Sequence, residues 1–242
     1  MTNVKHWARG RREDVLMCPT GGAYCSRNGP ATETASDCVS ALERILPALT
    51  AVLSYLLGSV PSALIAARLA GRPDPRTVGT GNAGSTNVAL TVGPAAGIAV
   101  LAADLLKGVV CALVGLSVGG PVLGDLCALA AVVGQIAPVF AGFRGGKGAA
   151  TTLGGYIGLS PALAIIGLAS WGIGLLIIRR AVLGTVTAIV ALGVVTIVVQ
   201  EHAVFGVGGA ILTLVAHRRD LAAWRRGEMP TIRESLRDNR RG

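Results

Sequence analysis

The chain has 242 residues, of which 52% are hydrophobic, 14% charged and 4% aromatic, and its formal net charge is +9. A charged fraction well below the roughly 25% of an ordinary soluble domain argues against a soluble enzyme, and the apolar content argues against a disordered chain. The few aromatic side chains leave little for stacking on bases, which argues against a nucleic-acid partner despite the positive charge. We predict a protein of the lipid bilayer.

The first 44 residues differ from the rest of the chain. Residues 1–44 are polar and turn-rich and carry both acidic and basic side chains, a composition typical of a flexible tail. A translation start further downstream would also account for this segment. We predict an integral membrane domain over residues 45–217 and a basic cytoplasmic tail over residues 218–242.

Apolar runs follow one another along the membrane domain, and a spanning helix needs about 20 such residues. They predict an all-α, polytopic membrane protein with about seven transmembrane helices. The expected spans are residues 46–67, 92–118, 122–142, two helices within 148–178 that meet near 158–161, 181–199 and 203–216. The loops on one side carry Lys and Arg, whereas the opposite loops carry Asp125 and Glu201. By the positive-inside rule, the N-terminus lies outside and the C-terminus in the cytoplasm.

Two ionisable residues interrupt the second predicted span. Asp104 and Lys107 are three residues apart, so they share a helix face and can pair. Charges inside a membrane are expensive, which calls for a structural or a functional reason. The pair could hold neighbouring helices together, or Lys107 could face a polar pocket for an anion; we favour the pocket.

A short glycine-rich turn, Arg144-Gly-Gly-Lys147-Gly148, precedes a run of small residues. Glycines allow backbone N–H groups to turn toward a ligand, and the start of a helix adds partial positive charge. The turn lacks the Ser or Thr of a Walker A loop. We predict a phosphate site here, the alternative being an ordinary positive cytoplasmic loop.

The stretch 79–87 matches the spacing of a dinucleotide fingerprint, but no buried strand precedes it, so we reject that match. Instead it offers small polar groups from Thr80, Asn82, Ser85, Thr86 and Asn87, which suit the lining of a wet cavity at a membrane face. His217 stands beside a basic cluster at the end of a span and is either an interfacial anchor or a functional group. The five cysteines show no metal-binding spacing.

Together these stretches resemble a known family. The chain from about residue 50 to 230 is similar to the bacterial acyl-phosphate-dependent glycerol-3-phosphate acyltransferases, the PlsY family. The matching segments are Leu57-Gly-Ser-Val-Pro61, Asp74-Pro-Arg76, residues 78–87, Asp104-Leu-Leu-Lys-Gly108, residues 138–151, His217-Arg218 and Gly227-Glu228.

The resemblance implies a seven-span fold in the bacterial cell membrane with its active site facing the cytoplasm. It implies transfer of a fatty acyl group from acyl phosphate to the 1-hydroxyl of glycerol 3-phosphate, giving lysophosphatidic acid and phosphate, with no cofactor or metal. The expected partners are these two substrates, the bilayer and the enzyme that supplies acyl phosphate. The residues expected to be catalytic are Lys147, Lys107, His217 and Asn87. Those expected to bind substrate are Ser59, Arg76, Thr80, Gly81, Asn82, Gly84, Thr86, Gly145, Gly146, Gly148 and Arg218.

The chain departs from the family pattern at four positions. The family usually has an arginine where this chain has Leu90, a histidine at Gln135, an asparagine at Asp220 and a serine at Thr80. Leucine cannot provide the bidentate hydrogen bonds that arginine gives to phosphate. Thr80 keeps the hydroxyl, but Leu90, Gln135 and Asp220 suggest an alternative: a diverged paralogue that binds phosphorylated lipid precursors without turnover, or one with a different acceptor. A small-anion transporter is a third hypothesis, based on the intramembrane Asp/Lys pair and the broken helices.

Overall fold

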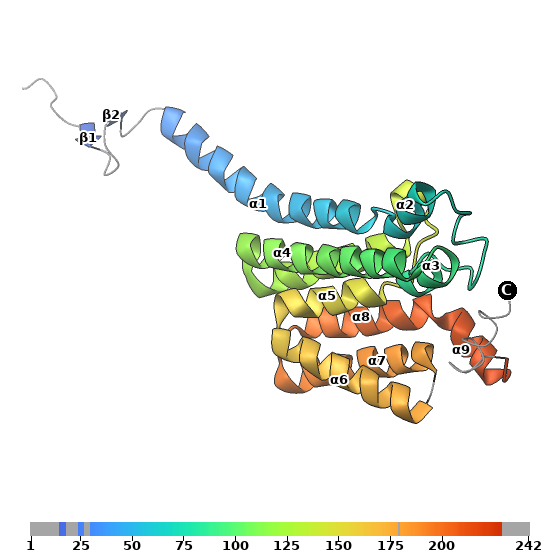
Figure 1. Ribbon diagram of the computed structural model, residues 1–242. Helices are drawn as coiled ribbons and strands as arrows, with labels where there is room; N and C mark the ends of the chain where they lie inside the picture. Colours follow the sequence, from blue (N-terminus) through green and yellow to red (C-terminus); the bar gives the residue numbers. More distant parts are fainter. Residues whose placement is uncertain (1–14, 18–23, 27–29, 179, 229–242) are drawn as a thin grey trace, which may run out of the picture. The chain divides into compact units, whose positions relative to one another are not determined.

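The computed structural model describes residues 15–17, 24–26, 30–178 and 180–228 (Figure 1). The chain forms two units, residues 1–46 and 47–242. In the first, strands β1 (Val15–Met17) and β2 (Tyr24–Ser26) pair antiparallel. Helix α1 (Pro30–Gly58) begins inside the segment predicted as a polar tail, where proline at the first position and the following alanines favour a helix. The other residues of that predicted tail, 1–14, 18–23 and 27–29, lie outside the described residues.

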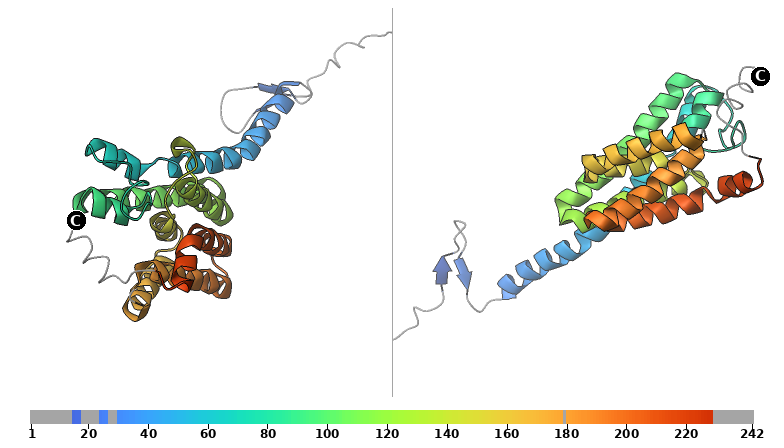
Figure 2. Two further views of the ribbon diagram at one scale, coloured as in Figure 1. Left: turned by 90° about the vertical axis from the view of Figure 1, so that its right-hand side faces the viewer. Right: turned by 90° about the horizontal axis from the view of Figure 1, so that it is seen from below.

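The second unit is built from helices alone over its described residues. After the end of α1 come α2 (Ser62–Leu69), α3 (Ser85–Thr91), α4 (Pro94–Ile136), the 3-10 turn η1 (Val139–Ala141), α5 (Ala149–Leu159), α6 (Pro161–Ile178), α7 (Ala181–Val199), α8 (Ala203–Ala216) and α9 (Arg218–Arg225). Figure 2 shows α4 to α8 running side by side in this unit.

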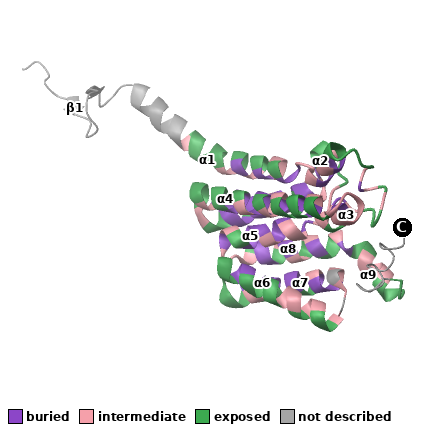
Figure 3. Ribbon diagram, in the orientation of Figure 1, coloured by how far each residue is buried: buried purple, intermediate pink, exposed green. Residues whose placement is uncertain are grey.

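Several of these helices suit a bilayer. Four described segments are long and apolar enough to cross a membrane: Ser40–Leu69, Pro94–Ala141, Pro161–Ile178 and Val182–Val199. Helix α8 is apolar but shorter. Large apolar side chains are exposed along these helices (Figure 3), including Ile165 at 69% and Leu176 at 78%. In water such a surface would be unfavourable, whereas lipid tails accommodate it, and the protein is an integral membrane protein.

The first predicted span, 46–67, is wrong as one continuous helix. Helix α1 ends at Gly58 and α2 begins at Ser62. Pro61 has no backbone N–H to continue the helix. The carbonyl oxygen of Val60 instead accepts a hydrogen bond of 2.6 Å from Lys107 Nζ, so the break brings a backbone acceptor to a buried cation.

The other predicted breaks are confirmed. Helix α4 leaves helical geometry at Gly119 and Gly120, where Gly120 has φ 72°, a conformation that glycine adopts at little cost. The chain folds back there, since Gly115 lies against Leu123. The run 148–178 divides at Ser160 into α5 and α6. A helix in the polar loop, α3, was not predicted.

Glycines allow α4 and α5 to approach closely. A Cβ on Gly108 would clash with the carbonyl oxygen of Thr151, and one on Gly154 would clash with that of Leu105. Small residues at such contacts let helix backbones pack together in a membrane. On the next face, Tyr156 of α5 packs edge-on against Phe205 of α8, with ring centroids 4.8 Å apart. This packing holds the polar residues of α4 beside the start of α5.

Candidate functional site

One large cavity is lined by residues of α3 and α9, among others. These two helices lie at the same end of the helix bundle (Figure 1). The volume of the cavity is about 710 Å³, within the range of small-molecule sites. Its wall combines polar and charged side chains with apolar side chains of α6 and α7, such as Leu175 and Val182. The lining residues are Thr80, Asn82, Gly84, Ser85, Thr86, Asn87, Leu90, Asp104, Gln135, Gly146, Lys147, Gly148, Ala149, Ala150, Thr151, Trp171, Leu175, Arg180, Val182, Thr185, His217 and Asp220.

Lys147 lies at the start of α5, as predicted, and it is paired. Its Nζ is 2.7 Å from Asp220 Oδ2, with both side chains about one-quarter exposed (26% and 24%). Gly148, which precedes α5, has φ 76°, so the backbone turns here in a conformation that suits glycine. Since Asp220 belongs to α9, the ion pair joins α9 to the predicted phosphate turn. An anionic ligand of Lys147 must therefore share this lysine with a carboxylate.

His217 lines the cavity at the junction of α8 and α9, and the residue is 2% exposed. Its Nδ1 lies 2.9 Å from the carbonyl oxygen of Thr213. Because a carbonyl can only accept, Nδ1 carries the proton and Nε2 is free of one in the neutral ring. Burial lowers the pKa of His217, the Thr213 carbonyl raises it, the charge of Lys147 lowers it and Asp220 raises it, with a net decrease. At neutral pH His217 is therefore a hydrogen-bond acceptor rather than a cation.

Asn87 organises the glycine-rich loop from within. The two N–H groups of its Nδ2 donate hydrogen bonds to the carbonyl oxygens of Pro75, Val78 and Asn82, at 2.5, 3.1 and 3.0 Å. Its Oδ1 accepts a hydrogen bond of 2.8 Å from the backbone N–H of Thr80. The side chain is almost fully buried. Asn87 thus positions the cavity wall, since these four hydrogen bonds of its side chain are all to the protein's own backbone.

Lys107 lies in a hydrogen-bonded cluster rather than in an open anion pocket. Its Nζ contacts Asp104 Oδ1 at 2.9 Å and Gln135 Oε1 at 3.0 Å, besides the Val60 carbonyl. Gln135 Nε2 donates to Asp104 Oδ2 at 2.9 Å, and Ser62 Oγ donates to Oδ1 at 2.5 Å. Complete pairing offsets much of the cost of burying two charges. Asp104 and Gln135 reach the cavity wall, whereas Lys107 is not among its lining residues. The geometry favours the structural alternative for Lys107.

The predicted site residues separate into two groups. The cavity wall brings together Lys147, His217, Asn87, Thr80, Asn82, Gly84, Thr86, Gly146 and Gly148; it does not include Lys107, Ser59, Arg76, Gly81, Gly145 or Arg218. Arg76 binds Asp74 at 2.7 Å and donates to the Ala141 carbonyl at 2.8 Å. The hydrogen bonds from Arg76 hold the pKa of Asp74 below its usual value. Ser59 donates to the Tyr55 carbonyl, and Arg218 to the Val215 carbonyl.

Trp171, Arg180 and Thr185 line the cavity but were not predicted to belong to a site. The pair Arg179-Arg180 was interpreted as a loop that marks the cytoplasmic side, and a basic pair by itself does not indicate which side chain faces inward. Within the described part of the chain, no group of three or more His, Cys, Asp or Glu side chains could hold a metal ion.

Comparisons with known proteins agree with this architecture. A family model described as glycerol-3-phosphate acyltransferase matches residues 48–227. The glycerol-3-phosphate acyltransferase of Thioalkalivibrio sulfidiphilus is 41% identical over 183 residues, which cover 74% of this chain and 90% of the relative. That of Geobacter sulfurreducens is 39% identical over 186 residues, covering 74% of this chain and 93% of the relative.

Two solved structures share the fold. Both are crystal structures of PlsY, an integral membrane glycerol 3-phosphate acyltransferase, one in its glycerol 3-phosphate form and one in its lysophosphatidic acid form. The first aligns with a TM-score of 0.73 at 31% identity and covers 77% of this chain and 95% of the other. The second aligns with a TM-score of 0.72 at 30% identity and covers 78% and 98%.

Proposed function

Because the chain belongs to the glycerol-3-phosphate acyltransferase family, we propose that its cavity transfers a fatty acyl group from acyl phosphate to the 1-hydroxyl of sn-glycerol 3-phosphate. The products are lysophosphatidic acid and inorganic phosphate, in the first step of phospholipid synthesis. The observation that carries this proposal is the convergence of Lys147, His217 and the glycine-rich loop on one cavity that residues of the apolar helices α6 and α7 also line. Such a cavity can hold phosphate groups at its polar wall and an acyl chain toward the lipid.

The reaction requires one bond to form and one to break. The 1-hydroxyl oxygen attacks the acyl carbon, and the bond from that carbon to the phosphate oxygen breaks. The proton of the hydroxyl is taken up by the departing phosphate. Nε2 of His217 can accept a hydrogen bond from the hydroxyl and orient it, and Lys147 stabilises negative charge on a substrate oxygen. Orientation and electrostatic stabilisation of this kind provide most of the catalysis in many enzymes.

The cavity is proposed to face the cytoplasm of a bacterial cell. Its wall includes residues from each loop that carries Lys or Arg, among them Lys147 and Arg180, whereas Glu201 belongs to the connection between α7 and α8. Asp125, which was expected in a loop of the opposite side, lies within α4. Positive loops favour the cytoplasmic side. The helices make seven spans if α1 and α2 count as one span, the two halves of α4 as two, and α5 to α8 as four. With seven spans, the N-terminus lies outside and the C-terminus inside. The enzyme that supplies acyl phosphate is the expected partner.

The role of Lys147 is testable by substitution. We expect Lys147→Ala to lower kcat/KM for glycerol 3-phosphate by about a hundredfold, because a charge-assisted contact to an anion is lost. Arg226→Gln is the control: Arg226 pairs with Glu228 at the surface, and both side chains are 58% exposed. Full activity of Lys147→Ala, with Arg226→Gln also active, would contradict this assignment of the site.

A further inference from the structure

The charged side chains that line the cavity differ in whether they have an ion-pair partner. Of the charged side chains on its wall, Asp104 is paired with Lys107 and Lys147 with Asp220. Arg180 differs: its Nε is buried, and it has no hydrogen-bond partner among the described residues. A buried N–H without a partner is costly. Arg180 therefore has donor capacity that an anion in the cavity would satisfy.

The same cavity lacks the arginine that the family pattern places at position 90. Leu90 lines the wall on α3, and Arg180 lines it just before α7. A leucine gives phosphate no hydrogen bond, whereas a guanidinium gives two in parallel. The chain thus has an arginine in this cavity, but on a different element.

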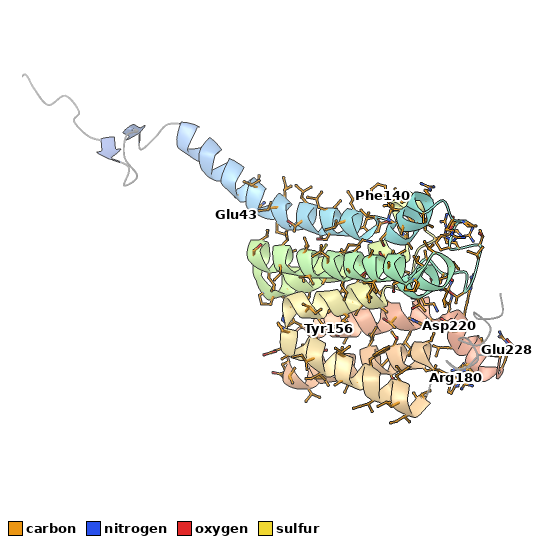
Figure 4. The ribbon with its side chains drawn as sticks, viewed as in Figure 1. Glu43, Phe140, Tyr156, Arg180, Asp220 and Glu228 are labelled. Atoms are coloured by element: carbon orange, nitrogen blue, oxygen red, sulfur yellow. The ribbon has the colours of Figure 1, made fainter. Side chains whose placement is uncertain are left out.

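The surroundings of Arg180 indicate what kind of anion fits. Trp171 and Leu175 of α6 and Val182 of α7 line the same cavity as Arg180, and both helices are candidate membrane spans. Trp171 Nε1 donates to Thr185 Oγ1 at 3.2 Å, which joins the two helices. Figure 4 shows Arg180 and Asp220 at the same end of the bundle. A cation placed where two lipid-facing helices meet suits an anion that carries an acyl chain.

We propose that Arg180 binds the phosphate group of the acylated substrate, acyl phosphate, and replaces the arginine missing at position 90. The inference rests on the proposed function. Arg180 holds the phosphate while the acyl chain lies along α6 and α7, and the same guanidinium stabilises the phosphate as it leaves. Glycerol 3-phosphate occupies the part of the cavity near Lys147 and His217.

The test is the steady-state kinetics of Arg180→Gln in detergent micelles with palmitoyl phosphate and glycerol 3-phosphate. We expect KM for palmitoyl phosphate to rise about tenfold or more, as the loss of a charged hydrogen bond predicts, while KM for glycerol 3-phosphate changes less than about threefold. The double variant Arg180→Gln/Leu90→Arg should recover most of the loss, because it restores a guanidinium to the cavity. Arg226→Gln is the matched surface control, and thermal melting checks that each variant folds.

Two kinetic results would overturn the inference. One is an unchanged KM for palmitoyl phosphate in Arg180→Gln, or a rise confined to glycerol 3-phosphate. The other is a double variant as weak as Arg180→Gln alone, which would contradict the replacement of the arginine at position 90.

A binding measurement separates this inference from the proposed function. If the unaltered protein forms no lysophosphatidic acid, the proposed function fails, and the shift in melting temperature on adding palmitoyl phosphate becomes the readout. A shift in the unaltered protein that Arg180→Gln lacks would still support the binding role. Equal shifts in both would overturn it.

Discussion

The Lys147–Asp220 ion pair predicts that Asp220→Asn improves the binding of glycerol 3-phosphate. The carboxylate oxygen of Asp220 lies 2.7 Å from Lys147 Nζ, so a substrate phosphate must compete with it. At this separation the Coulomb attraction is about 1.5 kcal/mol in a water-like medium, and measured values for exposed pairs are about 0.2–1 kcal/mol. Asparagine keeps a hydrogen-bond acceptor for Lys147 but removes the competing charge.

We expect KM for glycerol 3-phosphate to fall about fivefold, the equivalent of about 1 kcal/mol. The assay is initial-rate kinetics at saturating palmitoyl phosphate, at low and high NaCl. Salt should reduce the difference, since the pair is partly exposed and its charges are screened. Glu228→Gln is the control, because Glu228 pairs with Arg226 at the surface. An unchanged or higher KM in Asp220→Asn at low salt would show that the Asp220 carboxylate does not compete with the substrate phosphate for Lys147.

Two further predictions concern positioning and pH. Asn87→Asp should reduce kcat/KM as strongly as Asn87→Ala, by about tenfold or more, because an aspartate cannot donate to the loop carbonyls; near-normal activity in Asn87→Asp would contradict the role given to the amide. The pKa of His217 is lower in the folded protein than in the unfolded chain. As the pH falls below about 6.5, His217 is therefore protonated in the unfolded chain before it is protonated in the folded protein. The free energy of unfolding should therefore decrease from there down through the lower folded pKa. Denaturant titrations of His217→Gln should show a smaller decrease in the free energy of unfolding as the pH falls. The same pH profile in the variant and the unaltered protein would contradict the lowered pKa of His217.

The sequence predicted an all-helical membrane protein and two of its helix breaks, because apolar runs and the residues that interrupt them are local features. Glycines at 119 and 120 and Pro161 end helices through their own backbone properties, and the breaks occur there. The break at Pro61 was missed because the apolar run continues through it. Pro61 ends the helix locally, but the partner of the Val60 carbonyl is non-local: this carbonyl accepts a hydrogen bond from Lys107, which comes from another helix.

The candidate site could be predicted only in part. Polar residues in glycine-rich turns, such as Thr80 and Lys147, were recognisable because a wet cavity needs them, and both line the cavity. Pairing was not recognisable: spacing along the sequence does not show that Gln135 completes the Asp104–Lys107 pair. The inward position of Arg180 likewise depends on how α6 and α7 meet.

The most direct test of the account is to measure both products in one reaction. Purified protein in detergent is incubated with palmitoyl phosphate and glycerol 3-phosphate, and lysophosphatidic acid and inorganic phosphate are quantified over time. We expect the two products to form in equal amounts and both to require glycerol 3-phosphate. Phosphate released without lysophosphatidic acid, or neither product from folded protein, would contradict the proposed acyl transfer.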